Sequence, residues 1–144
     1  MPWLTTLPRP LPAKLRDDEN ALALLFARTD HRDYFEREGS GVYLSRDGGT
    51  TWKKVEAGLP KPPVGKIDVA IAPSDAKRMY ALIQTADQGS LWRSDDAGTT
   101  WQVVSWDRRL IGRAGYYIRI EVSPSNPDEI LTANSSFYQS TDGG

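Results

Sequence analysis

The sequence predicts an all-β protein made of repeated antiparallel sheets. The pattern S-x-D-x-G-x-T-W occurs at residues 45–52 and 94–101, and its first five positions return at residues 140–144. The three copies lie 49 and 46 residues apart, a spacing typical of proteins built from similar stacked units. Short segments rich in Val, Ile and Tyr, bounded by Gly, Pro and Asp, precede the copies and indicate β-strands.

The middle repeat contains four strand-like segments. Residues 65–72 alternate apolar and smaller or polar side chains, as in a strand with one buried face. Pro73-Ser74-Asp75 predicts a turn, because Pro restricts φ and Asp bonds to nearby backbone amides. Three further strands are expected at residues 78–84, 90–93 and 100–105.

The flanking repeats align with this template. Strands are expected upstream at residues 21–27, 41–44 and 51–55, and downstream at residues 117–122, 129–133 and 137–139. Residues 22–26 would also suit a helix by periodicity, but their alignment with Met79–Ile83 favours a strand. Residues 1–20 contain four of the ten prolines and predict an irregular arm, because Pro cannot donate to a sheet.

The repeated pattern has the composition of a turn between two strands. Gly adopts positive φ without steric cost, Asp and Ser or Thr oxygens bond to local amides, and Trp supplies a large apolar surface. We therefore expect these residues to be structural. They are Ser45, Asp47, Gly49, Thr51, Trp52, Ser94, Asp96, Gly98, Thr100, Trp101, Ser140, Asp142 and Gly144.

The pattern resembles the Asp-box (BNR) repeat of sialidase-like β-propellers. Residues 58–60, 69–74 and 108–117 also resemble large bacterial BNR-repeat proteins of the glycosyl-hydrolase-like and sortilin types. The resemblance implies a partial β-propeller of about three four-stranded blades, with the first and last incomplete. The remaining blades of a longer parent protein would then be partners of this segment.

The expected organisation follows the repeat. Residues 1–20 form the arm, 21–60 an incomplete first blade, 61–108 a complete second blade, and 109–144 a third blade truncated within its Asp-box. In the family that the chain resembles, Asp-boxes lie on the outer rim of the face opposite the active site. The resemblance thus implies that their aspartates do not form one catalytic or metal-binding set.

Asp30 is the candidate catalytic residue. Residues 26–30 are similar to a segment that bears a catalytic aspartate in xyloglucan-hydrolysing endoglucanase propellers. That family follows the aspartate with Gly-Gly and an aromatic residue, whereas His31-Arg32-Asp33 follows here. An inverting glycosidase also needs a second carboxylate roughly 6.5–9.5 Å away. The alternative is a solvated loop charge, and the same alternative applies to His31.

The link at residues 106–117 is the candidate ligand-binding segment. Arg109, Arg113 and Tyr116 interleave arginine with aromatic side chains, which suits recognition of carboxylates or sugars. The alternative is a connector with Trp106 and Tyr117 packed between blades. Sialidases bind a carboxylate through arginines from separate blades, which a local cluster does not reproduce. The proline-rich link at residues 59–65 is expected to be a stiff crossing.

The composition excludes several classes of function. The chain has 18 Lys and Arg against 19 Asp and Glu, which gives no electrostatic case for nucleic acid. It has one His and no Cys, so a thiol nucleophile and a transition-metal site are not indicated, and no cofactor is expected. No apolar run reaches the roughly 18 residues of a membrane span. The compartment stays open, although the family resemblance suggests a periplasmic or secreted parent.

Two functions follow from these patterns. The first is a non-catalytic module that binds a carbohydrate, peptide or protein ligand. The alternative is a fragment of a glycoside hydrolase with Asp30 as one of its two carboxylates. Fold resemblance does not by itself decide between them, because one fold serves many functions.

The repeat architecture also predicts how the isolated chain behaves. Three blades leave apolar sheet faces without neighbours, so we expect the 144-residue chain to oligomerise or aggregate. Size-exclusion chromatography with light scattering measures this. A monodisperse monomer that melts cooperatively would contradict the expectation.

Overall fold

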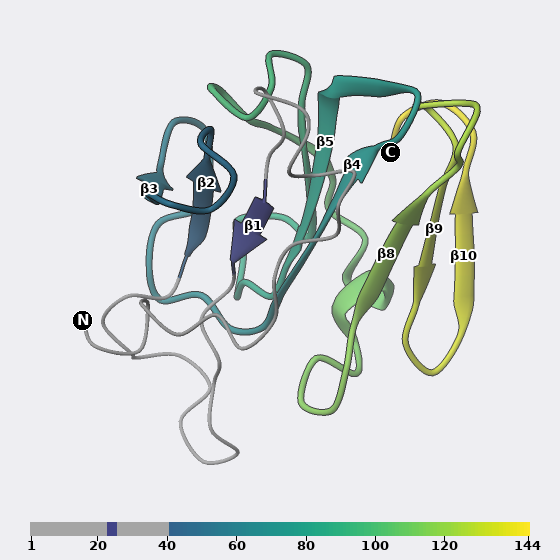
Figure 1. Ribbon diagram of the computed structural model, residues 1–144. Coiled ribbons are helices and arrows are strands. Elements are labelled where there is room, and N and C mark those ends of the chain that lie inside the picture. The colour runs from purple at the N-terminus through teal and green to yellow at the C-terminus, as the bar shows by residue number, and fades with distance from the viewer. Residues whose placement is uncertain (1–22, 26–40) are drawn as a thin grey trace.

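Three antiparallel sheets make up the described part of the chain, residues 23–25 and 41–144 of a computed structural model (Figure 1). We name them sheets A, B and C in chain order. Sheet A contains β1 (Ala23–Leu25), β2 (Val42–Ser45) and β3 (Lys53–Val55). Sheet B contains β4 (Ile67–Ala72), β5 (Asp75–Ile83), β6 (Leu91–Ser94) and β7 (Gln102–Ser105). Sheet C contains β8 (Arg119–Val122), β9 (Ile130–Ala133) and β10 (Phe137–Ser140).

Strand order follows chain order within every sheet, and all pairs are antiparallel. The all-β prediction is therefore confirmed, and apart from the start of β5 the strands lie within one residue of the expected segments. The N-terminal arm at residues 1–20 lies outside the described residues.

The first hairpin of sheet B is tighter than expected. Ala72 pairs with Asp75, so Pro73 and Ser74 alone reverse the chain and β5 begins at Asp75 rather than at Arg78. The Asp75 carboxylate accepts a hydrogen bond from the Lys77 amide at 3.0 Å. Asp75 thus bonds to nearby backbone as expected, but from the first position of a strand.

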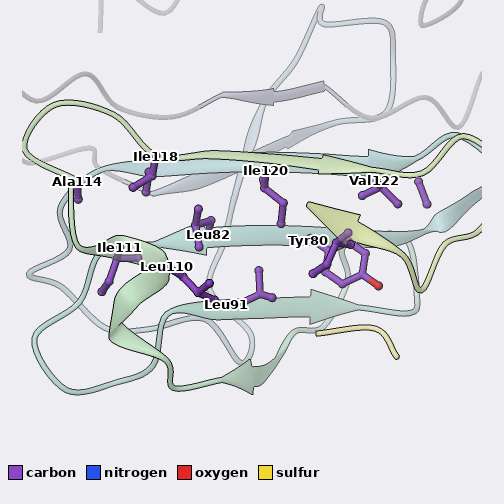
Figure 2. Close-up of a cluster of buried hydrophobic side chains, with 11 residues drawn as sticks. Tyr80, Leu82, Leu91, Leu110, Ile111, Ala114, Ile118, Ile120 and Val122 are labelled. Atoms are coloured by element: carbon purple, nitrogen blue, oxygen red, sulfur yellow. The ribbon is translucent and has the colours of Figure 1, made fainter. Parts of the chain in front are cut away.

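Two apolar cores separate the three sheets. The core between sheets A and B includes Val42, Leu44, Met79, Trp92 and Trp101, all buried. Figure 2 shows the core between sheets B and C, where Tyr80, Leu82 and Leu91 face Ile120 of β8 and Ile118, which precedes that strand. Alternate residues of β5 enter opposite cores, since successive side chains of a strand point to opposite faces.

Arginine side chains also tie successive sheets together. Arg46 donates to the Ala97 carbonyl at 3.0 Å, and Arg93 donates to the Gly143 carbonyl at 3.1 Å. Ala97 and Gly143 occupy the same position of the repeated pattern, so the two acceptors are equivalent, although Arg46 follows its motif serine and Arg93 precedes its own. The Tyr80 hydroxyl adds a further tie between sheets B and C, because it donates to the Pro127 carbonyl at 2.7 Å.

The link between sheets B and C, residues 106–117, buries other residues than the connector alternative of the sequence analysis implied. It contains a single 3-10 turn, η1 (Arg108–Ile111), whose Leu110 and Ile111 are buried in the core. The connector alternative placed Trp106 and Tyr117 between blades, but they are 61% and 45% exposed. The aliphatic side chains take the interior positions because the 3-10 turn directs them inward. No helix in the described residues is long and apolar enough to cross a membrane.

Truncation of Leu82 tests the core between sheets B and C. Leu82→Ala should lower the free energy of unfolding by about 2–5 kcal/mol, because Leu82 is fully buried and its removal leaves a cavity. Leu131→Ala is the matched control: Leu131 is 48% exposed, so we expect a loss below about 1 kcal/mol. Urea titration measures both, and equal losses would contradict this description of the core.

Candidate functional site

The first copy of the pattern closes the turn between β2 and β3 through its aspartate. Asp47 accepts hydrogen bonds from the Thr51 amide at 2.8 Å and from the Thr51 hydroxyl at 2.5 Å. The Ser45 hydroxyl donates to Asp47 at 2.8 Å and accepts from the Gly49 amide at 2.8 Å. The Trp52 indole N–H donates to the Gly49 carbonyl at 3.0 Å.

The second copy repeats this network between β6 and β7. Asp96 accepts from the Thr100 amide at 2.8 Å and from the Thr100 hydroxyl at 2.6 Å. Ser94 donates to Asp96 at 2.8 Å, and the Trp101 indole donates to the Gly98 carbonyl at 3.1 Å. We call residues 45–52, 94–101 and 140–144 the motif turns.

The third motif turn, residues 140–144, contains the serine–aspartate and serine–glycine hydrogen bonds of this network. Ser140 donates to Asp142 at 2.6 Å and accepts from the Gly144 amide at 3.0 Å. Gly49, Gly98 and Gly144 have φ values of 90°, 79° and 120°, which glycine adopts without strain. The residue before each glycine also has positive φ, and Ala97 is the one non-glycine with this backbone among the described residues.

The hydrogen bonds keep the turn carboxylates ionised. Those from the Thr51 side chain and amide lower the pKa of Asp47 to about 2. The equivalent bonds from Thr100 lower the pKa of Asp96, and the Ser140 hydroxyl lowers the pKa of Asp142. Because these carboxylates accept local hydrogen bonds and belong to three different sheets, they are poor candidates for general acid catalysis.

Loops gather at the opposite end of the sheets. The link from sheet A to sheet B, residues 56–66, meets the loop after β5. The Lys61 amide donates to the Gln88 side-chain oxygen at 2.8 Å, and the Gln88 side-chain nitrogen donates to the Lys61 carbonyl at 2.8 Å. Arg108 donates to the Ala86 carbonyl, which joins the second link to the same loop. Asn134, after β9, donates to the Arg109 carbonyl at 2.7 Å. We call this part of the molecule the loop end.

Arg109, a candidate ligand residue, is engaged by its own link. Its guanidinium Nε donates to both carboxylate oxygens of Asp107 at 2.9 Å and lies 5.5 Å from the centre of the Tyr138 ring. This hydrogen bond lowers the pKa of Asp107. Asp107 also accepts from the Arg109 amide at 2.9 Å and so begins η1. A ligand carboxylate would have to compete with Asp107 for this guanidinium.

Arg113 and Tyr116 form the more open pair of candidates. The Arg113 guanidinium lies 4.8 Å from the centre of the Tyr116 ring, within the range of a cation–π contact. Tyr116 is 67% exposed, and Trp106 and Tyr117 on the same link are also exposed. Exposed aromatic faces beside an arginine provide stacking surface and hydrogen-bond donors for a polar ligand.

A hollow of about 480 Å³ lies near the loop end, between sheet A and the link to sheet B. Its apolar lining includes Val55, Leu59 and Ile83, and its charged lining residues are Lys54, Glu56 and Lys61. Apolar walls with a few polar groups are typical of small-molecule sites. The proline-rich link, expected to be a crossing, therefore also lines a hollow.

Asp68 is a partly buried carboxylate that the sequence analysis did not select. It accepts a hydrogen bond from the Ile120 amide at 2.9 Å and lies 3.7 Å from Arg119, so it connects β4 to β8. Burial raises the pKa of Asp68, while the Ile120 hydrogen bond and Arg119 oppose that shift. A charged residue within the apolar alternation of residues 67–71 was the signal that could have identified it.

The catalytic candidate Asp30 and the single histidine, His31, lie outside the described residues. Among residues 23–25 and 41–144, no three His, Cys, Asp or Glu side chains form a group that could hold a metal ion. The described part of the loop end thus offers arginines, aromatic rings and the partly buried carboxylate of Asp68, with Asp107 already paired to Arg109.

Comparison with known proteins adds information about the fold. Neither protein-family models nor curated proteins match the sequence. Among solved structures, the chain is similar to a GH74 xyloglucanase from Xanthomonas campestris, with a TM-score of 0.53 and 15% sequence identity. The match covers 73% of this chain and 17% of the xyloglucanase chain, so the chain spans a small part of that protein. The neighbour is a β-propeller, and at this identity the likeness concerns the fold alone.

Substitution of Asp96 tests the motif turn through its pH dependence. The pKa of Asp96 is lowered in the folded chain, below the roughly 3.9 of an unperturbed aspartate. The carboxylate therefore stabilises the fold above about pH 4, and this contribution is lost as the pH falls towards the folded pKa. Asp96→Asn should lower the free energy of unfolding at pH 7 by about 1 kcal/mol, a modest loss because the group is exposed.

Thermal melts at pH 7, 4 and 2 measure this effect. The variant should lose less stability on acidification than the parent chain. Asp87→Asn is the matched control, because Asp87 lies exposed in the loop after β5 and should melt like the parent. An Asp96→Asn variant with the parent's melting temperature at pH 7 would contradict the proposed role of the carboxylate.

Proposed function

We propose that this chain is a BNR-type repeat segment of a larger β-propeller and acts as a non-catalytic binding module. Its three sheets are successive blades, and its motif turns are Asp-boxes. The ligand is a carbohydrate, or a peptide or protein segment with exposed carboxylates, bound at the loop end. The exposed Arg113–Tyr116 pair is the observation that carries this proposal.

The arrangement of the sheets supports the repeat assignment. Each motif turn follows the third expected strand of its sheet, and the same donor and acceptor positions recur in all three turns. Sheet B lies between two apolar cores, so it contacts a neighbouring sheet on both faces. The likeness to a propeller-containing structure agrees with successive sheets of this kind.

The chemistry of the loop end supports binding rather than catalysis. Asp107 is paired with Arg109, and Asp68 accepts a backbone hydrogen bond from the next sheet. Neither carboxylate is therefore available as a free general acid or base in the described residues. Arg113 and the aromatic rings of the link retain exposed surface that a sugar or carboxylate can contact.

The second candidate is a fragment of a glycoside hydrolase. The favouring observation is the structural likeness to a GH74 xyloglucanase, together with the similarity of residues 26–30 to a catalytic segment. In that case Asp30 supplies one carboxylate. The second would come from a part of the parent protein across the ring.

Binding at the loop end is tested with variants of the link. Affinity electrophoresis through xyloglucan and other polysaccharides, together with titration of acidic peptides, should show weaker binding for Arg113→Ala and Tyr116→Ala by about tenfold each. Lys77→Ala is the control. Lys77 is exposed in the first part of β5, at the end of the sheets where the motif turns lie, opposite to the loop end. Equal binding by all variants would overturn the assignment of this surface.

Asp30→Asn distinguishes the enzyme from the binding module. If the parent protein hydrolyses xyloglucan and Asp30 is one of its two carboxylates, turnover should fall by two or more orders of magnitude. Reducing-sugar assays of the full parent protein measure this. Unchanged turnover would remove Asp30 from the mechanism, and retained ligand binding without any turnover would favour the non-catalytic module.

A further inference from the structure

The two links between successive sheets fill the loop end differently. We call the contact between sheets A and B the first junction and the contact between sheets B and C the second. In the second junction, η1 carries Leu110 and Ile111 into the core, where Figure 2 shows them. In the first junction, residues 56–66 form no helical turn. The prolines of this link lack the N–H groups that hydrogen-bond within such a turn, and they stand at positions 60, 62 and 63.

The hollow of about 480 Å³ occupies the place in the first junction that η1 occupies in the second. Four of its lining residues have counterparts in the second junction, given by the motif spacing and the strand register. The pairs are Val42 with Leu91, Val55 with Val104, Ile67 with Ile118, and Ile83 with Asn134. The first three counterparts pack in or against the cluster that contains Leu110 and Ile111, and Asn134 donates to the Leu110 carbonyl at 2.9 Å.

Hydrogen bonds hold the link of the first junction on both sides of its last two prolines. Before them, the Lys61 backbone exchanges two bonds with the Gln88 side chain. After them, the Gly65 amide donates to the Gln84 carbonyl at 2.8 Å, and the Gln84 amide donates to the Lys66 carbonyl at 2.9 Å. The link would have to break these bonds to move into the hollow, which leaves backbone groups unsatisfied.

The hollow combines an apolar floor with one unbalanced positive charge. Val42 and Ile83 in its floor are each 1% exposed. Its charged lining residues are two lysines and one glutamate, and the Lys54 ammonium lies 3.6 Å from the Glu56 carboxylate, so these two neutralise each other. The Lys61 ammonium is exposed and has no ion pair with any side chain of residues 23–25 or 41–144.

We infer that this hollow is a binding site for an apolar monocarboxylate, a small molecule with a hydrocarbon body and one carboxylate. The body occupies the space that Leu110 and Ile111 fill in the second junction, and the carboxylate pairs with Lys61. The volume falls within the roughly 300–1,000 Å³ of small-molecule sites. A sugar would leave its hydroxyls without partners on the apolar floor. This site is separate from the ligand surface proposed at Arg113 and Tyr116 and does not depend on it.

Octanoate and octylammonium test the site, because they share a hydrocarbon chain and differ in the sign of their charge. Titration calorimetry of the full 144-residue chain should show at least fivefold tighter binding of octanoate. Lys61→Ala should remove most of this preference, because the remaining pair of Lys54 and Glu56 has no net charge. Lys53→Ala is the matched control: Lys53 is exposed on β3 and does not line the hollow, so the preference should persist.

Two further variants locate the hydrocarbon chain. Leu59→Trp places a larger side chain in the hollow and should weaken octanoate binding at least tenfold, whereas Leu131→Ala on the exposed face of sheet C should leave it unchanged. If Leu59→Trp fails to fold, the charge preference and its loss in Lys61→Ala decide alone.

Four results would overturn the proposal. They are no octanoate binding, equal affinity for the two ligands, a preference that survives Lys61→Ala, and undiminished octanoate binding by a folded Leu59→Trp variant. Octanoate binding that appears only when the chain is diluted would assign the hollow to a second copy of the chain and also overturn it.

Discussion

The carboxylate of each complete motif turn closes the connection between two paired strands, and the rest of the structure depends on this constraint. In the complete turns the aspartate bonds both the amide and the hydroxyl of the threonine four residues later. The serine hydroxyl bonds the same carboxylate and the glycine amide, which closes the turn on both sides. The tryptophan that follows then has a defined direction, because its indole N–H is bonded to the carbonyl of that glycine.

Packing between sheets converts these local turns into a larger structure. The Trp101 side chain lies in the core between sheets A and B. The hydrogen bond of its indole to Gly98 is local, but it orients the ring for contacts with residues distant in sequence. Arg46 and Arg93 then bond equivalent carbonyls in the next motif turn. The same spacing between sheets therefore recurs along the chain, with apolar burial supplying the main favourable free energy and the arginines aligning the turns.

The two ends of the sheets differ in how their side chains are used. At the motif turns, aspartate, serine and threonine satisfy one another and the local backbone, so few polar groups remain for a ligand. At the loop end, η1 buries Leu110 and Ile111, while Arg113 and Tyr116 stay at the surface. Loops that pack through aliphatic residues and expose arginine and aromatic rings are suited to recognition, since the scaffold beneath them is held by both neighbouring sheets.

The sequence by itself determined the strands and the residues that close each turn, because alternation along a strand and hydrogen bonds over four residues are local properties. It could not indicate that Leu110 and Ile111 are buried while Trp106 is exposed, since a 3-10 turn decides which way they point. Nor could it show that Asp68 bonds the next sheet or that Thr132 lines a hollow between sheets B and C. Those properties depend on which surfaces meet when distant strands pack, and only the tertiary structure decides that.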